Sequence, residues 1–352
     1  MCMIKILHSG DWHLDSPMQG RSADQAAALR EALTKIPGKL AELCKERGCQ
    51  LVLLSGDLFD GSYTPSTYRA VYDALESMQV PVFISPGNHD FISPDSPYEK
   101  ELWPENVHIF KSPQIQWVDV PELGLRVYGA GFAGMDCPGL LEGFRAEGKA
   151  VGVFHGDPTQ PNSPYNPVTR AQVADSGLMY LALGHVHKGD RFLAGKTLCA
   201  WPGCPMGRGW DEPGEKGALI VTLDETAQAE FVSLGSPKFF DFSVDAQAGV
   251  GSVLPGAGSD DHYRVTLTGE SEPIDLDAIR AEFAAFPNLV LRDRTVRPVD
   301  IWAGAGEDSF EGVYFGMLKA ALEAASEEEK EKILLAAKLS RQLLEGQEVA
   351  LP

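Results

Sequence analysis

The sequence lacks any long apolar run: none of its hydrophobic stretches approaches the roughly 18 residues that a membrane-spanning helix needs. The opening stretch up to His8 is too short and too soon interrupted by polar residues to resemble a secretory signal. The sequence contains no internal repeat and no low-complexity segment. We therefore expect a cytoplasmic protein without a membrane segment, and 352 residues allow one large domain with an appendage.

Cysteine is spread too thinly for a disulfide scaffold, with six residues at positions 2, 44, 49, 137, 199 and 204. Four residues separate Cys44 from Cys49, and four separate Cys199 from Cys204. A structural zinc site usually has a tighter knuckle with two intervening residues. We therefore expect unpaired thiols.

Basic residues are scarce, because 30 Lys and Arg face 50 Asp and Glu and the formal net charge is −20. Acidic residues outnumber basic ones on both sides of residue 235, so the charge does not come from one tail. Such a charge opposes non-specific binding to a polyanion such as DNA. Any nucleic-acid contact must come from a local basic patch or from a partner.

In the first two thirds of the sequence, short apolar segments alternate with amphipathic ones. The run Leu51–Ser55 is almost wholly apolar, which predicts a strand covered on both faces. Early β-α-β units followed by a series of strands predict a layered α/β fold with two sheets. Helices are predicted at 23–47, with a break near Pro37-Gly38, and at 65–78, and strands at 4–8, 51–55, 80–85, 125–130, 151–155, 178–183, 197–201, 218–223 and 229–234.

The pattern changes near Gly235-Ser236-Pro237. Residues 1–235 form the predicted large domain, residues 238–300 a small α/β module, and residues 305–352 a C-terminal pair of helices. The last helix, over 327–345, begins with a capping box at Ser326. Its apolar stripe can pack on the chain's own domain or bind a partner, and consists of Leu335, Ala336, Leu339 and Leu343.

Five short motifs come directly after predicted strands, and each carries potential metal ligands. Loops at the carboxyl ends of strands gather at a common site in α/β sheets. Each motif alone is weak evidence, since a buried histidine is more often a core residue than a ligand, but five in succession form a coherent set. They are Asp11-Trp12-His13, Gly56-Asp57-Leu58-Phe59-Asp60, Gly87-Asn88-His89-Asp90, His155-Gly156 and Gly184-His185-Val186-His187.

These residues predict a site for two metal ions with mixed nitrogen and oxygen ligands and no thiolate. Such a set suits manganese, iron or zinc better than calcium or magnesium. We expect Asp57 to bridge the two ions. The first ion would be held by Asp11, His13, Asp57 and His187, and the second by Asp57, Asn88, His155 and His185.

The predicted chemistry is phosphoester hydrolysis. Two cations about 3.5–4 Å apart can clamp a phosphate and deprotonate a bridging water at neutral pH. The resulting hydroxide would attack phosphorus in line. His89 would protonate the leaving oxygen as general acid, and Asp90 would orient His89.

The five motifs, in this order, resemble the metallophosphoesterase signature of calcineurin-like enzymes over about residues 4–190. Within that superfamily the sequence is most similar to the SbcD-type DNA repair exonucleases. The start Ile6-Leu7-His8-Ser9-Gly10-Asp11 resembles the opening strand of that family. The stretches 201–208 (WPGCPMGR) and 215–217 (EKG) resemble its P-G-x-x-x-G-R and E-x-K-G sequences, which generic phosphatases lack.

This resemblance implies a four-layer αββα sandwich with a small α/β capping module and C-terminal helices. It implies an exonuclease that acts on DNA ends with two divalent ions, manganese above all. The family usually works as a dimer bound to an SbcC-type coiled-coil ATPase through its C-terminal helices, but this chain is short in that part. DNA contact would use Lys188, Arg191, Lys196 and Arg208, which follow the last ligands.

Two alternatives remain open. The acidic charge favours a calcineurin-like phosphatase or phosphodiesterase acting on small phosphoesters, because a small substrate needs no extended basic track. A non-catalytic scaffold with the same fold is the other alternative. It is the weaker one, because all seven ligand positions and His89 are filled by suitable residues.

Overall fold

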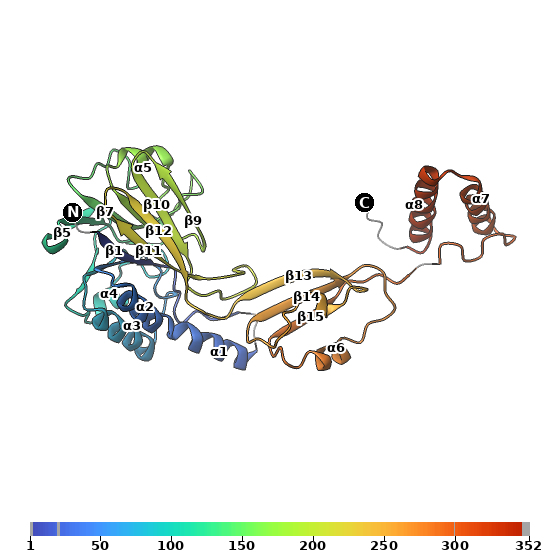
Figure 1. Ribbon diagram of the computed structural model, residues 1–352, viewed down its shortest axis with the longest axis horizontal. Coiled ribbons are helices and arrows are strands. Elements are labelled where there is room, and N and C mark those ends of the chain that lie inside the picture. The colour runs from blue at the N-terminus through green and yellow to red at the C-terminus, as the bar shows by residue number, and fades with distance from the viewer. Residues whose placement is uncertain (1–2, 20–21, 299, 347–352) are drawn as a thin grey trace. The chain divides into compact units, whose positions relative to one another are not determined.

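The computed structural model describes residues 3–19, 22–298 and 300–346 (Figure 1). The chain folds into two compact units. The first comprises the residues up to Asp241 together with Asp260–His262, and the second comprises Phe242–Ser259 and the residues from Tyr263 onward. No described helix has the length and apolar character that crossing a bilayer requires.

Two six-stranded sheets form the first unit, and each has a core of four parallel strands. Parallel strands place their carboxyl ends along one edge, which is where polar loops can meet. The first sheet consists, in spatial order, of β12 (Ala227–Ser233), β11 (Gly217–Leu223), β1 (Ile4–Ser9), β2 (Leu51–Leu54), β3 (Val82–Ile84) and β4 (Val107–Ile109). The second consists of β5 (Gln116–Val120), β6 (Leu125–Gly129), β7 (Ala150–His155), β8 (Tyr180–Gly184), β10 (Thr197–Gly203) and β9 (Lys188–Ala194).

Apolar side chains on both faces of the strands build three buried layers. Leu53 of the first sheet and Val153 of the second belong to the cluster between the sheets. Leu54 points into a second cluster with the helices on the outer face, and Phe154 into a third on the other side. Figure 1 shows α2 and α3 on one side of the sandwich and α5 on the other. The four-layer αββα arrangement is therefore confirmed.

The predicted long helix over 23–47 is two helices, α1 (Ala23–Thr34) and α2 (Ile36–Arg47). The break lies at Lys35, before the predicted Pro37-Gly38, because proline fits the first turn of a helix but not its interior. Helix α2 ends at Gly48, whose φ is 64°. The Cys49 amide then donates to the Cys44 carbonyl (2.9 Å). The thiols of these two cysteines are free, as expected.

Several short elements escaped the sequence pattern. They are α4 (Pro97–Lys100), β4, β5, α5 (Arg170–Asp175) and β9. The three strands lie at sheet edges, and their partly exposed side chains do not alternate cleanly between apolar and polar. Helix α3 (Pro65–Met78), by contrast, matches its predicted bounds, because Thr64 caps its start and proline follows in the first turn.

Among its described residues, the second unit holds most of a three-stranded sheet and three α-helices. The sheet has the order β13 (Phe239–Asp245), β14 (His262–Thr268), β15 (Leu289–Asp293), and its last two strands are parallel. Helix α6 (Leu276–Glu282) lies between β14 and β15 in the chain and begins at Asp275, which accepts two backbone hydrogen bonds. The stretch predicted as a small α/β module, residues 238–300, thus contains three strands and the helix α6.

Helices α7 (Phe310–Ala324) and α8 (Glu327–Leu344) pack against each other through few buried side chains. Phe315 and Ala337 are fully buried, and the Arg341 guanidinium lies 4.0 Å from the centre of the Phe315 ring. The stripe predicted on α8 does not face this contact. Its members Leu335 and Leu343 are exposed.

Candidate metal centre

The strand ends of the first unit bring all seven predicted ligands to one place. The loop after β1 carries Asp11 and His13, the loop after β2 carries Asp57, and the loop after β3 carries Asn88. His155 is the last residue of β7, and the turn after β8 carries the other two histidines, His185 and His187.

Several of these ligands have a backbone conformation that side chains rarely adopt. The φ angles are 53° at Asp11, 47° at His13, 51° at Asp57 and 98° at His185. Such residues cost free energy and persist only where their surroundings fix them. Here the loops fix one another. The Asp11 amide donates to the backbone carbonyl of Gly56 and the His13 amide to the backbone carbonyl of Asp57, both at 2.9 Å.

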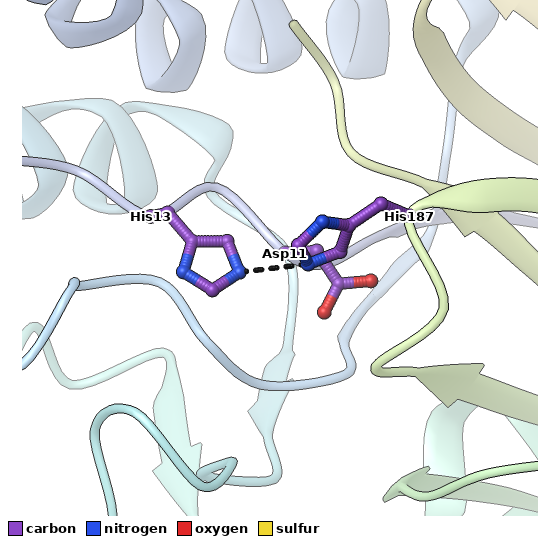
Figure 2. A group of neighbouring side chains, drawn as sticks. All are labelled: Asp11, His13 and His187. Carbon is purple, nitrogen blue, oxygen red and sulfur yellow. Dashed lines mark hydrogen bonds between the residues drawn. The ribbon is translucent and has the colours of Figure 1, made fainter. Parts of the chain in front are cut away.

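One group of ligand atoms is formed by Asp11, His13 and His187 (Figure 2). The Nε2 atoms of the two histidines lie 3.0 Å apart. Their ligand atoms and a carboxylate oxygen of Asp11 all lie within 4.8 Å of one another. Three donor atoms thus converge on a space of the size of one cation.

A second group lies around the Asn88 side chain. Its Oδ1 atom is 2.9 Å from Nε2 of His155 and 3.3 Å from Nδ1 of His185. Asp57 lies between the two groups: its Oδ2 atom is 3.4 Å from Nε2 of His155 and 3.7 Å from Nε2 of His13. This is the position that a bridging carboxylate requires.

The neutral rings of His13 and His185 suit metal ligands. Burial lowers the pKa of His13 to about 3 and that of His185 to about 4, so both rings are neutral and keep a lone pair at pH 7. Burial, with the nearby charge of Asp90, raises the pKa of Asp57 to about 7, and burial also raises the pKa of Asp11. A positive ion between these carboxylates would favour their ionised forms. The residues present therefore fit two metal ions.

Two contacts fix the orientation of the donor atoms. Nδ1 of His155 lies 2.8 Å from the Ser55 carbonyl oxygen, so this nitrogen carries the proton and Nε2 is the ligand. Gly87 allows a close approach, because a Cβ atom there would lie 2.2 Å from Oδ1 of Asp57. A larger residue would displace the proposed bridging carboxylate.

The predicted general acid, His89, stands at the mouth of the site with its side chain 42% exposed. Its Nδ1 atom lies 2.7 Å from Oδ1 of Asp60. This hydrogen bond raises the pKa of His89 despite partial burial. The ring also meets the His13 ring edge-on, with centroids 4.7 Å apart.

The role predicted for Asp90 needs correction, because the carboxylate on His89 belongs to Asp60. Asp90 accepts hydrogen bonds from the amides of Leu58 (2.7 Å) and Gly87 (2.8 Å) and from the hydroxyl of Tyr98 (2.6 Å). It therefore ties the loops after β2 and β3 together. The reason is geometric: neighbours in sequence on a tight turn point in different directions.

The predicted DNA-contacting cations lie in different surroundings. Lys188 and Arg191 are exposed on β9, and Lys196 is exposed in the turn after it. Arg208 has a side chain that is only 17% exposed and donates to the Glu212 carboxylate.

Two carboxylates of the site, Glu212 and Asp60, were assigned no role from the sequence. Asp60 was visible in the second motif, where it follows the bridging ligand by three residues. Nothing in the sequence distinguishes Glu212 from the other acidic residues. Its position beside His187 depends on how the chain folds back after β10.

Comparisons with known proteins found a family and several similar chains. The model of the calcineurin-like phosphoesterase family matches residues 4–189. The uncharacterized metallophosphoesterase YhaO of Bacillus subtilis (strain 168) is 28% identical, over 62% of this chain and 57% of that protein. The chain thus spans little more than half of YhaO.

Two further similarities extend over about two thirds of the chain. The SbcD subunit of the SbcCD nuclease from Bacillus subtilis (strain 168) is 24% identical, over 66% of this chain and 71% of that protein. The crystal structure of a dimetal phosphatase from Danio rerio is 11% identical, covers 66% of this chain and 97% of that one, and has a TM-score of 0.44.

Proposed function

The chain belongs to the calcineurin-like phosphoesterase family, and from this premise we propose that it is a two-metal phosphodiesterase that cleaves DNA from its ends. Membership of the family implies a metal-dependent phosphoester hydrolase. The observation that carries the proposal is the gathering of histidine nitrogens and carboxylate oxygens at the strand ends, with Oδ2 of Asp57 3.7 Å from Nε2 of His13 and 3.4 Å from Nε2 of His155.

The residues would divide between the ions as their contacts suggest. One ion would be held by Asp11, His13, Asp57 and His187, and the other by Asp57, Asn88, His155 and His185. When bound, two such ions polarise a phosphoryl group and lower the pKa of water. Manganese suits this donor set and is the ion that we propose.

His89 and Asp60 supply the proton chemistry. The carboxylate of Asp60 accepts from Nδ1 of His89 and so leaves Nε2 of the ring for exchange with substrate. Because this contact raises the pKa of His89, the ring can hold a proton for the leaving oxygen near neutral pH. The exposed side of the ring is where a phosphodiester can enter.

Three observations support DNA as the substrate. One relative with similarity over much of the chain is part of a nuclease by name. The stretches 201–208 and 215–217 resemble the SbcD-type exonucleases. Lys188 directly follows the last ligand, His187, and Lys188 and Arg191 are both exposed on β9, where they can meet a phosphate backbone.

A small phosphoester is the second candidate substrate. It is favoured by the net charge of −20 and by the engagement of Arg208 with Glu212, which leaves few cations near the site for a polyanion.

Manganese-dependent digestion of end-labelled linear DNA, beside hydrolysis of a small chromogenic phosphodiester at low salt, separates the two. We expect the wild-type protein to shorten DNA and His89→Ala to lose about 10²- to 10⁴-fold in rate. Cleavage of the small ester with DNA untouched at every salt concentration would favour the second candidate. Full activity of His89→Ala would reject its role as general acid.

We further propose that helix α7 docks on a coiled-coil ATPase of the SbcC type. Exposed apolar residues on α7 follow the alternating three- and four-residue spacing of a coiled-coil seam. Phe310 is 85% exposed and Met317 is 69% exposed. The seam consists of Phe310, Val313, Met317, Ala320 and Ala324.

Copurification with the SbcC-type ATPase of the source organism tests this docking. We expect the double change Phe310→Glu and Met317→Glu to abolish the complex and to leave hydrolysis of a small ester intact. Lys319→Glu is the matched control, since Lys319 is exposed on the same helix but outside the seam. A complex that survives the double change would contradict the docking proposal.

A further inference from the structure

The segment from Gly203 to Lys216 folds around His187, the last ligand in the chain. It contains residues 203–208, the end of the stretch that resembles the SbcD-type family. The proposed hydrolytic mechanism assigns these residues no role. The structure shows contacts from this segment to both the backbone and the ring of His187.

Three groups surround the backbone carbonyl of His187. The Cys204 amide and the Lys216 ammonium group each donate to it at 3.3 Å. Gly203, with a φ of 74°, approaches so closely that a Cβ atom there would lie 2.4 Å from the same oxygen. The backbone of the ligand is thereby held from one side.

The ring of His187 is held by Glu212. Oε1 of Glu212 lies 2.7 Å from Nδ1 of His187, and only 5% of the Glu212 side chain is exposed. The second carboxylate oxygen, Oε2, accepts from the Arg208 amide at 2.8 Å. The carboxylate therefore cannot rotate away from the ring without losing contacts on its other side.

Arg208 determines the charge of this arrangement. Its guanidinium donates to Oε1 of Glu212 at 2.6 Å and lies 3.1 Å from Nδ1 of His187. A donor and an acceptor thus both approach Nδ1. The carboxylate contact is shorter and charged, so the proton belongs on Nδ1 and points to Glu212. The Arg208 charge offsets that of Glu212, which would otherwise be buried and unbalanced.

We propose that Glu212, held by Arg208, is a positioning residue that keeps His187 protonated at Nδ1 and directs its Nε2 atom to the metal ion shared with Asp11 and His13. This inference rests on the proposed two-metal function. Nε2 of His187 already faces Nε2 of His13, as the tautomer requires (Figure 2). Carboxylate partners of ligand histidines set the tautomer and raise ligand basicity, and their loss costs about 10- to 100-fold in metal affinity or activity.

Calorimetric titration of the metal-free protein with Mn²⁺ tests the proposal without reference to activity. We expect Glu212→Gln to weaken one of two binding events by about 10- to 100-fold and to leave the other unchanged. Glu215→Gln is the matched control, because Glu215 lies in the same segment but is 57% exposed and paired with Lys238. It should bind both ions as the wild-type protein does.

A double-mutant cycle separates positioning from a general effect on the fold. In a His187→Ala background, Glu212→Gln should change Mn²⁺ affinity no further. A persistent loss in that background, or unchanged binding of both ions in the single variant, would overturn the role of Glu212. Failure of the wild-type protein to bind two ions would overturn the proposed function together with this inference.

The His187 tautomer can also be measured in the wild-type protein, so the proposal stays testable should the Glu212 variants fail to fold. In the zinc-loaded protein with ¹⁵N-labelled histidine, assigned by comparison with His187→Gln, we expect His187 to be protonated at Nδ1 and to bind zinc through Nε2. Binding through Nδ1 would contradict the proposal.

Discussion

The candidate metal centre of the first unit and the helical pair of the second differ in which kind of side chain they bury. Around Asp57, polar side chains are buried and their hydrogen bonds go to named partners. On α7, apolar side chains such as Phe310 are exposed. The donor atoms of an ion site must stand at fixed distances, and here they come from loops of one unit. The helix proposed to dock can leave its apolar face open until a partner covers it.

The largest expected effect comes from Asp57→Ala, which removes the side chain proposed to bridge the two ions. We expect neither ion to be retained at stoichiometric level and the loss of activity to exceed the roughly 10- to 100-fold that outer partners cost. Metal content after gel filtration, measured by mass spectrometry, checks this. Two retained ions per chain would reject the bridging assignment.

A smaller effect is expected for Asp60→Asn, which keeps the size of the side chain but removes the charge that holds His89. We expect the rate of ester hydrolysis to fall by about 10- to 100-fold, less than for His89→Ala. Asp73→Asn is a suitable control, since Asp73 forms an exposed ion pair with Arg69 on α3. Equal hydrolysis rates for Asp60→Asn and Asp73→Asn would reject Asp60 as the residue that orients His89.

Removal of metal should destabilise the first unit and leave the second unit unchanged. Ions present at 100 times their dissociation constant stabilise a folded protein by about 2.7 kcal/mol per site. We therefore expect chelation to speed hydrogen exchange in β1, β2, β7 and β8 and to leave exchange in α7 and α8 unchanged. An equal change in both regions would show that the ions do not stabilise the first unit alone.

The smallest effect is expected on the exposed seam. Met317→Ala should change stability by less than about 0.5 kcal/mol, because the side chain has little packing to lose. Phe315→Ala, on the buried side of the same helix, removes the ring beneath Arg341 and should cost about 3–5 kcal/mol. Hydrogen exchange of α8 amides measures the loss of stability in each variant. Similar losses for Met317→Ala and Phe315→Ala would mean that the exposed and buried faces of α7 do not differ.

Some features of this protein follow from the local sequence. The strand Leu51–Leu54 was predictable because a short apolar run between polar loops has few other solutions. The start of α3 was predictable because Thr64 and Pro65 form a known start signal. The edge strand β9 was not, because its pairing with β10 depends on the neighbour and not on its own pattern.

By itself, the sequence determined which donors exist and in what order they leave the strands, because parallel strands bring their carboxyl ends to one edge. Only the tertiary structure decided which carboxylate holds which histidine. Asp60 and not Asp90 holds His89, and Glu212 holds His187 from 25 residues away in the chain. A hydrogen bond depends on direction and on distances of a few tenths of an ångström, and these are set by how loops pack against each other.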